Sequence, residues 1–587
     1  MDKSKITKSL AMFASVLLTI IIGVASFAYF GTFNVNLNNN VAVNINSSSP
    51  GDATFISNAT QLNLQVPAAN MSYTAANNEV AAASNTAFLD VTLTGSQNLL
   101  TTCTYDIVYE YDAGSNVYGQ GTTTKTSDAT KEITIEVNGM NGNNHFGVET
   151  NFDHANIQSY YDSTNKYYKL VEGATIKSLG STQSVRWKII GRYYNLDVSQ
   201  AQLSGRNFTG KIYAISKGCS SEDGTTVKKG YETILANNGG TASMTTLTST
   251  DFATVTTASD KGMYKAQDDL GTSYYFRGAV DNNWVKYGKY TKDTYITADS
   301  DGNISLIESC DGIDNCYKLA SKGDDMYWRI IRVNGDNSIR MIYAGTYAPD
   351  TNTKVVMTND SYDDDDIFAR DTSAGYSKFN KNYNSAEYVG YMYTIGEQHG
   401  TSQSSDIKTY LEDWYANYTN LNATGTKITD QIYCNDRTAS TDSSGTPGEI
   451  SSWASTGTTY NYGALLRIST PSPSLICSNA NDKFSTTTAI GNGKLSYPVG
   501  LITADEINMA GARSSNQSYY LYTGDYYWAG SPGHFLSGEA KGFHVGMDGR
   551  LGGDNAIVAE VVRGVVSLSS DAKLLGSGTY DDVYIVS

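Results

Sequence analysis

The sequence has 587 residues, enough for several domains, and 42 Lys and Arg against 59 Asp and Glu give it a formal net charge of −17. A chain this acidic offers no electrostatic footprint for nucleic acid or anionic lipid, so both partner classes are excluded. Charged residues amount to only 17%, whereas tyrosine (44) and glycine (54) are abundant and aromatic residues reach 11%. This composition excludes bulk disorder and indicates a folded, β-rich chain with mostly uncharged polar groups.

Residues 1–28 have the features of an export signal. Three lysines between residues 3 and 8 precede an uncharged stretch over residues 9–30, which contains the small-x-small sequence Ser26-Phe27-Ala28. This pattern favours cleavage after Ala28. The stretch is also long enough to cross a bilayer, so an uncleaved transmembrane anchor is the alternative. In either case we expect the mature chain outside the cell, at the cell surface or secreted.

Residues 29–215 show the alternation of apolar and polar side chains that is typical of half-buried strands. The segments 103–112, 131–137, 184–190 and 208–215 all follow it, and polar turn clusters separate them. Several short strands without a convincing helix predict an antiparallel β-sandwich or jelly roll. Residues 216–262 are rich in polar and turn-forming residues, with one short helix expected near 230–236, and predict a linker that lets the two flanking modules move.

Residues 263–587 mix strands with at least two helices, which predicts an α+β domain. A hairpin is expected over 330–345, with its turn at Asn334–Asn337. A helix is expected from about 404 to 415, with Ser404 or Ser405 as its N-cap. Thr503 and Glu506 form the capping box of a second helix, which Gly511 ends.

The six cysteines do not form a C-x-x-C pair, which disfavours structural zinc, and an even count is compatible with disulfides. Six cysteines allow fifteen connectivities, of which we expect Cys310–Cys316 and Cys434–Cys477, with Cys103–Cys219 as the remainder. Free buried thiols are the alternative.

Two segments carry resemblances to known families. The sequence GVASFAYF, followed by GDATFISNATQLNL within the first 65 residues, resembles the start of biofilm-matrix fibre proteins and camelysin-type proteins of Gram-positive bacteria. This resemblance implies export, and as an alternative it implies a structural subunit of an extracellular matrix or fibre, self-associating through β edges.

The order of YWRIIRV, YPVGLITADE, YYWAGSP and RGVVSL over roughly 270–587 resembles a bacterial surface domain related to the C-type-lectin-like fold of formylglycine-generating enzymes. That resemblance implies a C-type-lectin-like α+β domain. The family has Arg-Pro-Val where this chain has Arg563-Gly564-Val565. The enzyme relatives oxidise with a cysteine pair near the end of the domain, and no cysteine follows Cys477, so oxidase activity is the least favoured alternative.

An aromatic cluster near the end of the chain is a candidate ligand-binding surface, because aromatic rings with polar tips suit recognition of sugar or protein. Ordinary packing in the core or on a sheet face is the favoured alternative for most of them. Two nearby histidines, at 534 and 544, make a pocket in this region conceivable, although ordinary loop and strand positions explain them as well. The candidate ligand-binding residues are Tyr519, Tyr520, Tyr522, Tyr526, Tyr527, Trp528 and His534.

The acidic run Asp363, Asp364, Asp365 and Asp366 could supply oxygen ligands for Ca²⁺, with a solvated loop as the favoured alternative. No specific cofactor motif is present. The chain also lacks H-E-x-x-H, G-x-S-x-G and P-loop motifs, and its other histidines are dispersed. We therefore expect a non-catalytic adhesin or ligand-binding protein that recognises an extracellular carbohydrate or protein through an aromatic and polar face.

Overall fold

The structure is a computed structural model. It describes residues 41–45, 53–65, 81–95, 99–111, 133–139, 161–162, 164, 167–194, 207–224, 227–257, 261–299, 302–313, 316–349, 353–355 and 373–587. The expected export signal, and with it the proposed anchor over residues 9–30, lies outside these ranges. Within them, no helix has the length and apolar character needed to cross a membrane.

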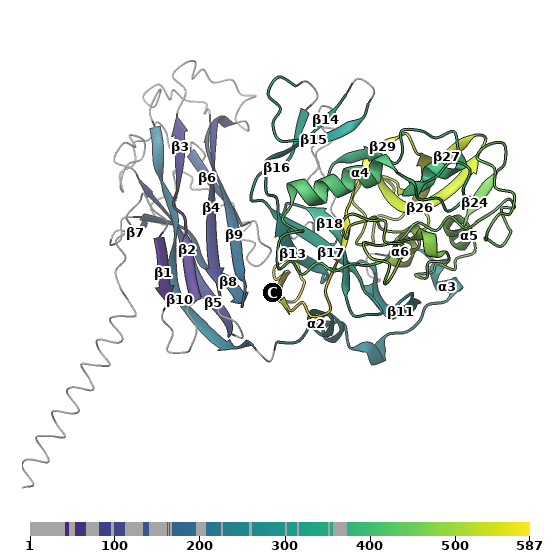
Figure 1. The fold of residues 1–587 in the computed structure, drawn as a ribbon. Coiled ribbons are helices and arrows are strands. Elements are labelled where there is room, and N and C mark those ends of the chain that lie inside the picture. The colour runs from purple at the N-terminus through teal and green to yellow at the C-terminus, as the bar shows by residue number, and fades with distance from the viewer. Residues whose placement is uncertain are drawn as a thin grey trace, which may run out of the picture.

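Two five-stranded antiparallel sheets account for the N-terminal part of the chain (Figure 1). The first has the order β1 (Val41–Ile45), β2 (Ala53–Ser57), β4 (Ala81–Thr94), β9 (Thr182–Tyr194) and β6 (Ile133–Gly139). The second has the order β3 (Thr60–Gln65), β10 (Asn207–Asp223), β5 (Leu99–Tyr111), β8 (Tyr167–Leu179) and β7 (Tyr161–Asp162).

One hydrophobic core joins these two sheets. Alternate residues of β4, among them Leu89 and Val91, are fully buried, as the alternating pattern predicts. Trp187 of the first sheet meets Tyr105 of the second, and its Nε1 donates a hydrogen bond to the tyrosine hydroxyl over 3.0 Å. The residues that give the sequence its period of two are therefore those that hold the two sheets together.

The boundary between the two parts differs from the predicted linker. Residues 216–223 continue β10, and Cys219 lies opposite Cys103 of β5. Residues 230–252 pack on the C-terminal part, where Ile234, Leu235 and Met244 are buried in its core. Over the described residues 227–257, the turn-rich composition reflects short helices and tight turns that a few buried apolar side chains anchor to the C-terminal core.

Two larger sheets form the C-terminal part. The first has the order β11 (Lys261–Asp268), β12 (Gly271–Gly278), β17 (Asp325–Val333), β13 (Trp284–Lys289), β32 (Tyr584–Val586) and β31 (Leu574–Leu575), and β18 (Ile339–Gly345) links β17 to β30 (Val565–Leu568). The second has the order β19 (Tyr376–Lys378), β29 (Ala559–Val561), β26 (Tyr527–Leu536), β24 (Tyr460–Tyr462) and β23 (Ala439–Ser440), and β27 (Glu539–Val545) links β26 to β28 (Leu551–Asn555).

Smaller sheets and short helices complete this part. The small sheets comprise β15 (Ile304–Ile307), β14 (Thr294–Ala298) and β16 (Cys316–Ala320), then β20 (Met392–Tyr393) with β21 (Gln403–Ser404), and β22 (Tyr433–Cys434) with β25 (Lys483–Phe484). The helices are α2 (Gly230–Asn237), α3 (Ser249–Phe252), α4 (Asp406–Asp413), α5 (Gly463–Ser469) and α6 (Ala504–Ala510), with single turns η5 (Thr241–Ser243), η6 (Ala386–Val389), η7 (Trp414–Tyr418) and η8 (Ala480–Asp482).

Local signals predicted several of these elements correctly. The hairpin is β17 and β18, and Asn337 in its turn takes a positive φ of 67°. Ser405 caps α4 by accepting a hydrogen bond from the backbone N–H of Lys408. Thr503 and Glu506 form the expected capping box of α6, and Gly511 ends the helix with φ 127°.

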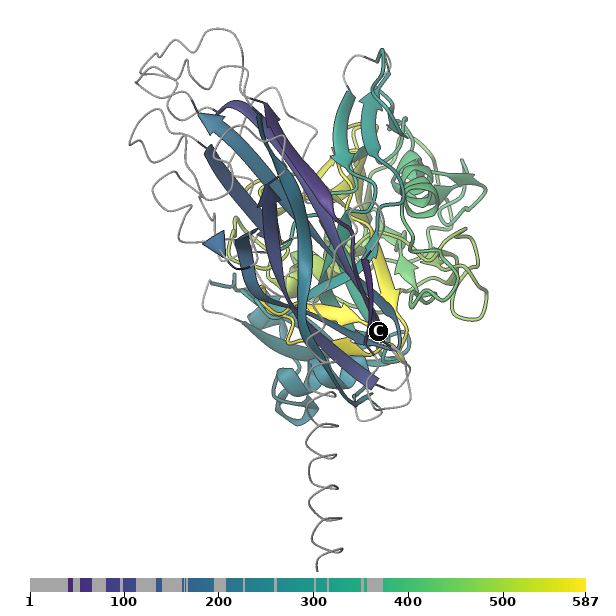
Figure 2. The same cartoon turned by 90° about the vertical axis from the view of Figure 1, so that its left-hand side faces the viewer.

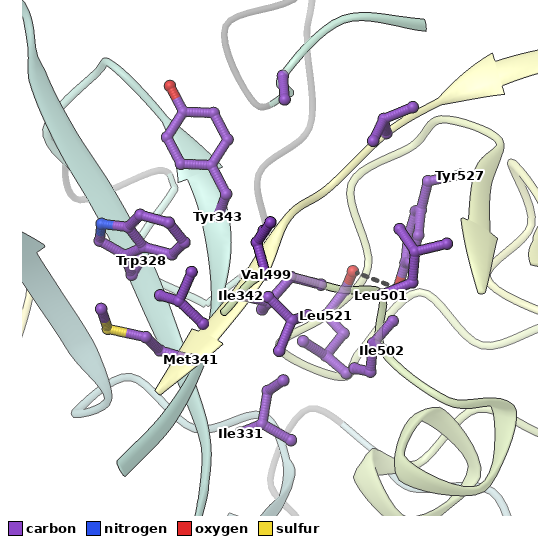
Figure 3. Packing of buried hydrophobic residues seen from close by; sticks show 14 of the residues in the cluster. Trp328, Ile331, Met341, Ile342, Tyr343, Val499, Leu501, Ile502, Leu521 and Tyr527 are labelled. Atoms are coloured by element: carbon purple, nitrogen blue, oxygen red, sulfur yellow. Dashed lines mark hydrogen bonds between the residues drawn. The ribbon is translucent and has the colours of Figure 1, made fainter. Parts of the chain in front are cut away.

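The C-terminal core lies between the two large sheets (Figure 3). Trp328, Met341 and Tyr343 from β17 and β18 pack toward Leu501 and Ile502, which precede α6. This single large cluster explains why sequence segments hundreds of residues apart fold as one unit.

The N-terminal and C-terminal parts lie side by side in Figure 1, and in Figure 2, turned by 90°, the N-terminal sheets lie in front of the C-terminal part. Arg186 of β9 donates a hydrogen bond to the carbonyl of Lys322 over 2.7 Å, and the same guanidinium nitrogen lies 3.4 Å from a carboxylate oxygen of Asp324. Lys286 of β13 donates to the carbonyl of Ser184 over 2.9 Å. Direct side-chain contacts therefore join the two parts, in addition to the chain itself.

Candidate functional site

Three disulfides pair the cysteines as expected, Cys103–Cys219, Cys310–Cys316 and Cys434–Cys477. No cysteine is free in the described part of the chain. Disulfides of this kind persist in oxidising compartments, so they are consistent with an extracellular location.

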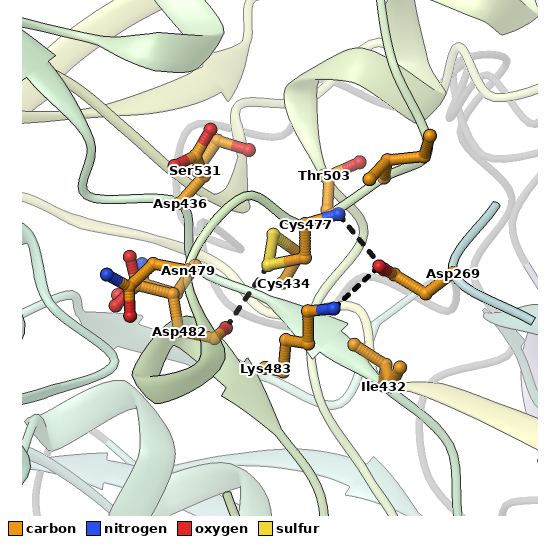
Figure 4. Close-up of a disulfide and its surroundings, with 12 residues drawn as sticks. Asp269, Ile432, Cys434, Asp436, Cys477, Asn479, Asp482, Lys483, Thr503 and Ser531 are labelled. Carbon is orange, nitrogen blue, oxygen red and sulfur yellow. Dashed lines mark hydrogen bonds and ion pairs between the residues drawn. A yellow bond between two sulfur atoms is a disulfide. The ribbon is translucent and has the colours of Figure 1, made fainter. Parts of the chain in front are cut away.

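A small cavity that opens to solvent lies beside the Cys434–Cys477 disulfide, whose surroundings are shown in Figure 4. Near this disulfide, Asp269 accepts hydrogen bonds from the backbone N–H of Cys477 and from the Lys483 ammonium group, over 2.9 and 2.8 Å. The cavity is lined by Asp268, Asp269, Leu270, Arg332, Arg340, Gln431, Ile432, Cys434, Asp436, Arg467, Ser474, Leu475, Ile476, Thr503, Asp505, Glu506 and Ser531.

Glu506 is the centre of the buried charge network on one wall. Its Oε1 accepts a hydrogen bond from Arg332 Nε over 3.0 Å and lies 2.7 Å from Arg340 Nε, although the N–H of Arg340 is not aligned with it. Burial alone would raise the pKa of Glu506, but the positive charges of Arg340 and Arg332 outweigh it, and the pKa is lowered. The carboxylate is therefore ionised at neutral pH. Arg332 also forms an ion pair with Asp268, in which Arg332 Nη1 donates a hydrogen bond to Asp268 Oδ2 over 2.6 Å.

Arg467 of α5 pairs with two further carboxylates of the cavity lining. Its Nε and one terminal nitrogen each donate to one oxygen of Asp505 over 2.8 Å. This bidentate geometry fixes the guanidinium plane relative to the carboxylate plane. The remaining terminal nitrogen donates to Asp436 over 2.7 Å. Burial would lower the pKa of Arg467, but the two carboxylates outweigh it and raise the pKa.

The lining combines fixed charges with neutral polar and apolar groups. Five carboxylates face three guanidinium groups, so the cavity has an excess of negative charge. Gln431, Thr503 and Ser531 add donors and acceptors, and Ile476 is 49% exposed at the rim. Such a surface can hold a neutral ligand rich in hydroxyl groups, because hydroxyls donate to carboxylates and accept from guanidinium groups.

The prediction of an exposed recognition face is wrong for five of the seven candidate ligand-binding residues. Tyr519, Tyr520, Tyr522, Tyr527 and Trp528 are buried, at 6% exposure or less. Their polar tips serve the fold: the hydroxyl groups of Tyr519, Tyr522 and Tyr527 donate to the carbonyls of Gly549, Met547 and Leu521, and Trp528 Nε1 donates to the carbonyl of Ser377. The alternative of core packing is correct for these side chains, because they pack against the C-terminal core and not toward solvent.

Tyr526 and His534 are the two members with substantial solvent exposure. Tyr526 is 46% exposed, and its ring lies 5.3 Å from the ring of His544. His534 of β26 is half-buried, and burial together with the nearby charge of Lys541 lowers its pKa. Neither residue lines the cavity beside the disulfide. The acidic run Asp363–Asp366 lies outside the described residues.

Sequence reasoning missed the arginines and carboxylates of the cavity. Arg332 and Arg340 stand in strands whose residues are all buried, and Glu506 stands in a helix that is buried along its whole length. Charged residues within largely apolar runs are the signal that could have indicated a buried ionic network. Comparison of the chain with protein-family models gave no match, and neither the curated proteins nor the solved structures gave a significant one.

Proposed function

We propose that this chain is an exported bacterial surface protein that binds an extracellular carbohydrate in the cavity beside the Cys434–Cys477 disulfide and does not catalyse a reaction. In this proposal the N-terminal sheets form a β-sandwich, and the C-terminal part is a C-type-lectin-like domain that carries the ligand site. The observation that carries the proposal is the cavity lining, where carboxylate, guanidinium, amide and hydroxyl groups converge.

The charge of the cavity supports a neutral ligand. An anionic ligand would face five carboxylates against three arginines. Saccharides combine hydroxyl groups with an apolar ring face, which the rim residues Leu475 and Ile476 could contact.

The proposal is tested by applying the full chain to a glycan array that also carries matrix proteins, followed by titration calorimetry with any glycan that binds. Ile476→Ser removes apolar surface at the cavity rim without disturbing the core, and we expect it to weaken glycan binding about tenfold, or ~1.4 kcal/mol. Ile313→Ser is the matched control, because Ile313 is 43% exposed and does not line the cavity.

The two variants give clear outcomes. Loss of affinity in Ile476→Ser but not in Ile313→Ser supports the cavity as the binding site. Binding to matrix protein alone would favour protein as the ligand. No binding to either class would contradict the proposed function.

The alternative function is a structural subunit of a matrix or fibre. The observation that favours it is that β3 and β6, each at the edge of a described N-terminal sheet, offer backbone groups for pairing with another copy. A chain that remains monomeric in sedimentation experiments at high concentration would contradict this alternative.

A further inference from the structure

Three residues capable of binding a metal ion meet on the second C-terminal sheet, away from the cavity. His544 of β27 lies opposite Gly552 of β28, and Asp554 lies opposite Gly542. Positions that are directly opposite or two apart on neighbouring strands share one face of a sheet, so His544 and Asp554 lie on the same face. Glu560, on β29, completes the group.

The ligand atoms of these residues are close enough for one ion. One nitrogen of His544 and one carboxylate oxygen each from Asp554 and Glu560 all lie within 4.8 Å of one another. His544 Nδ1 and Glu560 Oε1 lie 2.6 Å apart, within hydrogen-bond distance. A metal ion with bonds of about 2.0–2.3 Å to nitrogen and oxygen would need only small side-chain adjustments to bind all three.

Glu560 supplies the observation that points to a ligand. The residue is only 3% exposed, and its Oε2 is buried with no hydrogen-bond partner in the described part of the chain. A buried carboxylate oxygen without a donor is costly, and a cation bound at this position would remove that cost.

The neighbouring glycine keeps the space in front of the imidazole open. A Cβ added to Gly552 would lie 2.7 Å from His544 Nε2, so any side chain there would displace the ring. The cluster also reaches the surface, because Asp554 is partly exposed and the half-exposed ring of Tyr526 lies against His544. Water could therefore occupy further coordination positions.

We propose that His544, Asp554 and Glu560 bind one divalent transition-metal ion of the Zn²⁺ or Mn²⁺ type. One imidazole nitrogen with two carboxylate oxygens suits these borderline ions better than Ca²⁺, which takes oxygen ligands. Two carboxylates also neutralise the charge of the ion. The site is independent of the proposed glycan cavity, and the two share no lining residue.

The test uses the full chain, stripped with a chelator and then loaded separately with Zn²⁺, Mn²⁺ or Ca²⁺ before desalting and elemental analysis. We expect one equivalent of Zn²⁺ or Mn²⁺ per chain, accompanied by a rise in melting temperature. Asp554→Asn should lose the bound metal and the rise in melting temperature. Because Asp554 is partly exposed, this variant should retain the fold. Gly552→Ala is a second variant that displaces the imidazole without removing a carboxylate.

Two controls distinguish this cluster from other acidic groups. Glu539→Gln removes an exposed carboxylate from the same sheet and should leave metal binding unchanged, since Glu539 only pairs with Lys541. Replacing Asp363–Asp366 with asparagines should also leave it unchanged. Co²⁺ loaded in place of Zn²⁺ should give a visible absorption spectrum that is lost in His544→Gln. Absence of bound Zn²⁺ and Mn²⁺, or binding that survives Asp554→Asn, would overturn the proposal.

Discussion

Arg332 Nε donates a hydrogen bond to Glu506 Oε1 over 3.0 Å, although 174 residues separate the two in the chain. This contact joins the central strand β17 to the first turn of α6. Both side chains are almost fully buried, and Arg340 shares the same carboxylate. The charge network at the cavity wall therefore also connects β17 and β18 of the first large sheet to α6, the helix next to the second large sheet.

We expect Glu506→Gln to reduce the free energy of unfolding by about 3–5 kcal/mol, because it leaves two buried arginines without their shared counter-charge. Urea unfolding measures this effect. The control is Glu308→Gln, since Glu308 and its partner Lys292 are exposed and such pairs contribute no more than about 1 kcal/mol. Equal losses in the two variants would contradict the network.

The lowered pKa of Glu506 predicts a dependence of stability on acid. Because its pKa in the folded chain lies below the usual value of 4.5, its contribution is fully present above pH 4.5 and is lost as the pH falls through the lower folded value. The stability difference between the wild type and Glu506→Gln should therefore be constant near neutrality and shrink in acid. Urea unfolding curves collected over this pH range measure the stability difference, and a difference that grows in acid would contradict the prediction.

The disulfides should differ in how much they stabilise the chain. Cys103 and Cys219 are 116 positions apart, whereas Cys310 and Cys316 are six apart. Loop-closure entropy predicts a contribution of about 5 kcal/mol for the first disulfide and about 2 kcal/mol for the second. Paired Cys→Ala variants, unfolded in urea without reductant, test this order. A larger loss for the Cys310–Cys316 pair would contradict the entropic account.

Arg186 should hold the N-terminal and C-terminal parts together. It contacts Asp324 and the carbonyl of Lys322 across the boundary, and it also pairs with Asp90 in its own sheet. We expect Arg186→Ala to increase proteolysis near residues 224–228 and to increase the radius of gyration measured by small-angle X-ray scattering. Arg192→Ala, which breaks a pair with Glu136 inside the same sheet, should do neither.

The sequence predicted those elements whose signals are local. Period-two alternation identified strands such as β5 and β9, and capping residues identified α4 and α6, because these patterns depend on neighbours a few positions away. The tyrosine cluster failed for a related reason. Composition identified the aromatic cluster but not the direction of its side chains: β26 begins only at Tyr527, and the preceding turns direct the aromatic rings into the core.

Local sequence patterns could not predict the cavity or the proposed metal site. Arg332, Arg467 and Glu506 come from three separate segments, and His544 meets Glu560 only because β29 pairs in parallel with β26. No spacing of residues along the chain indicates that these side chains are close together in the fold. The position of Gly552 in front of an imidazole is likewise apparent only once the strand register is known.

The last strand, β32, lies between β13 and β31 in the first large sheet and pairs in parallel with β13. The carbonyl of Val586 on the same strand accepts a hydrogen bond from Gln183 of the N-terminal part. A sheet that begins near residue 261 therefore stays open until residues 584–586 have been synthesised. A chain shortened before Tyr584 would lack β32 and would leave β13 as an unpaired sheet edge.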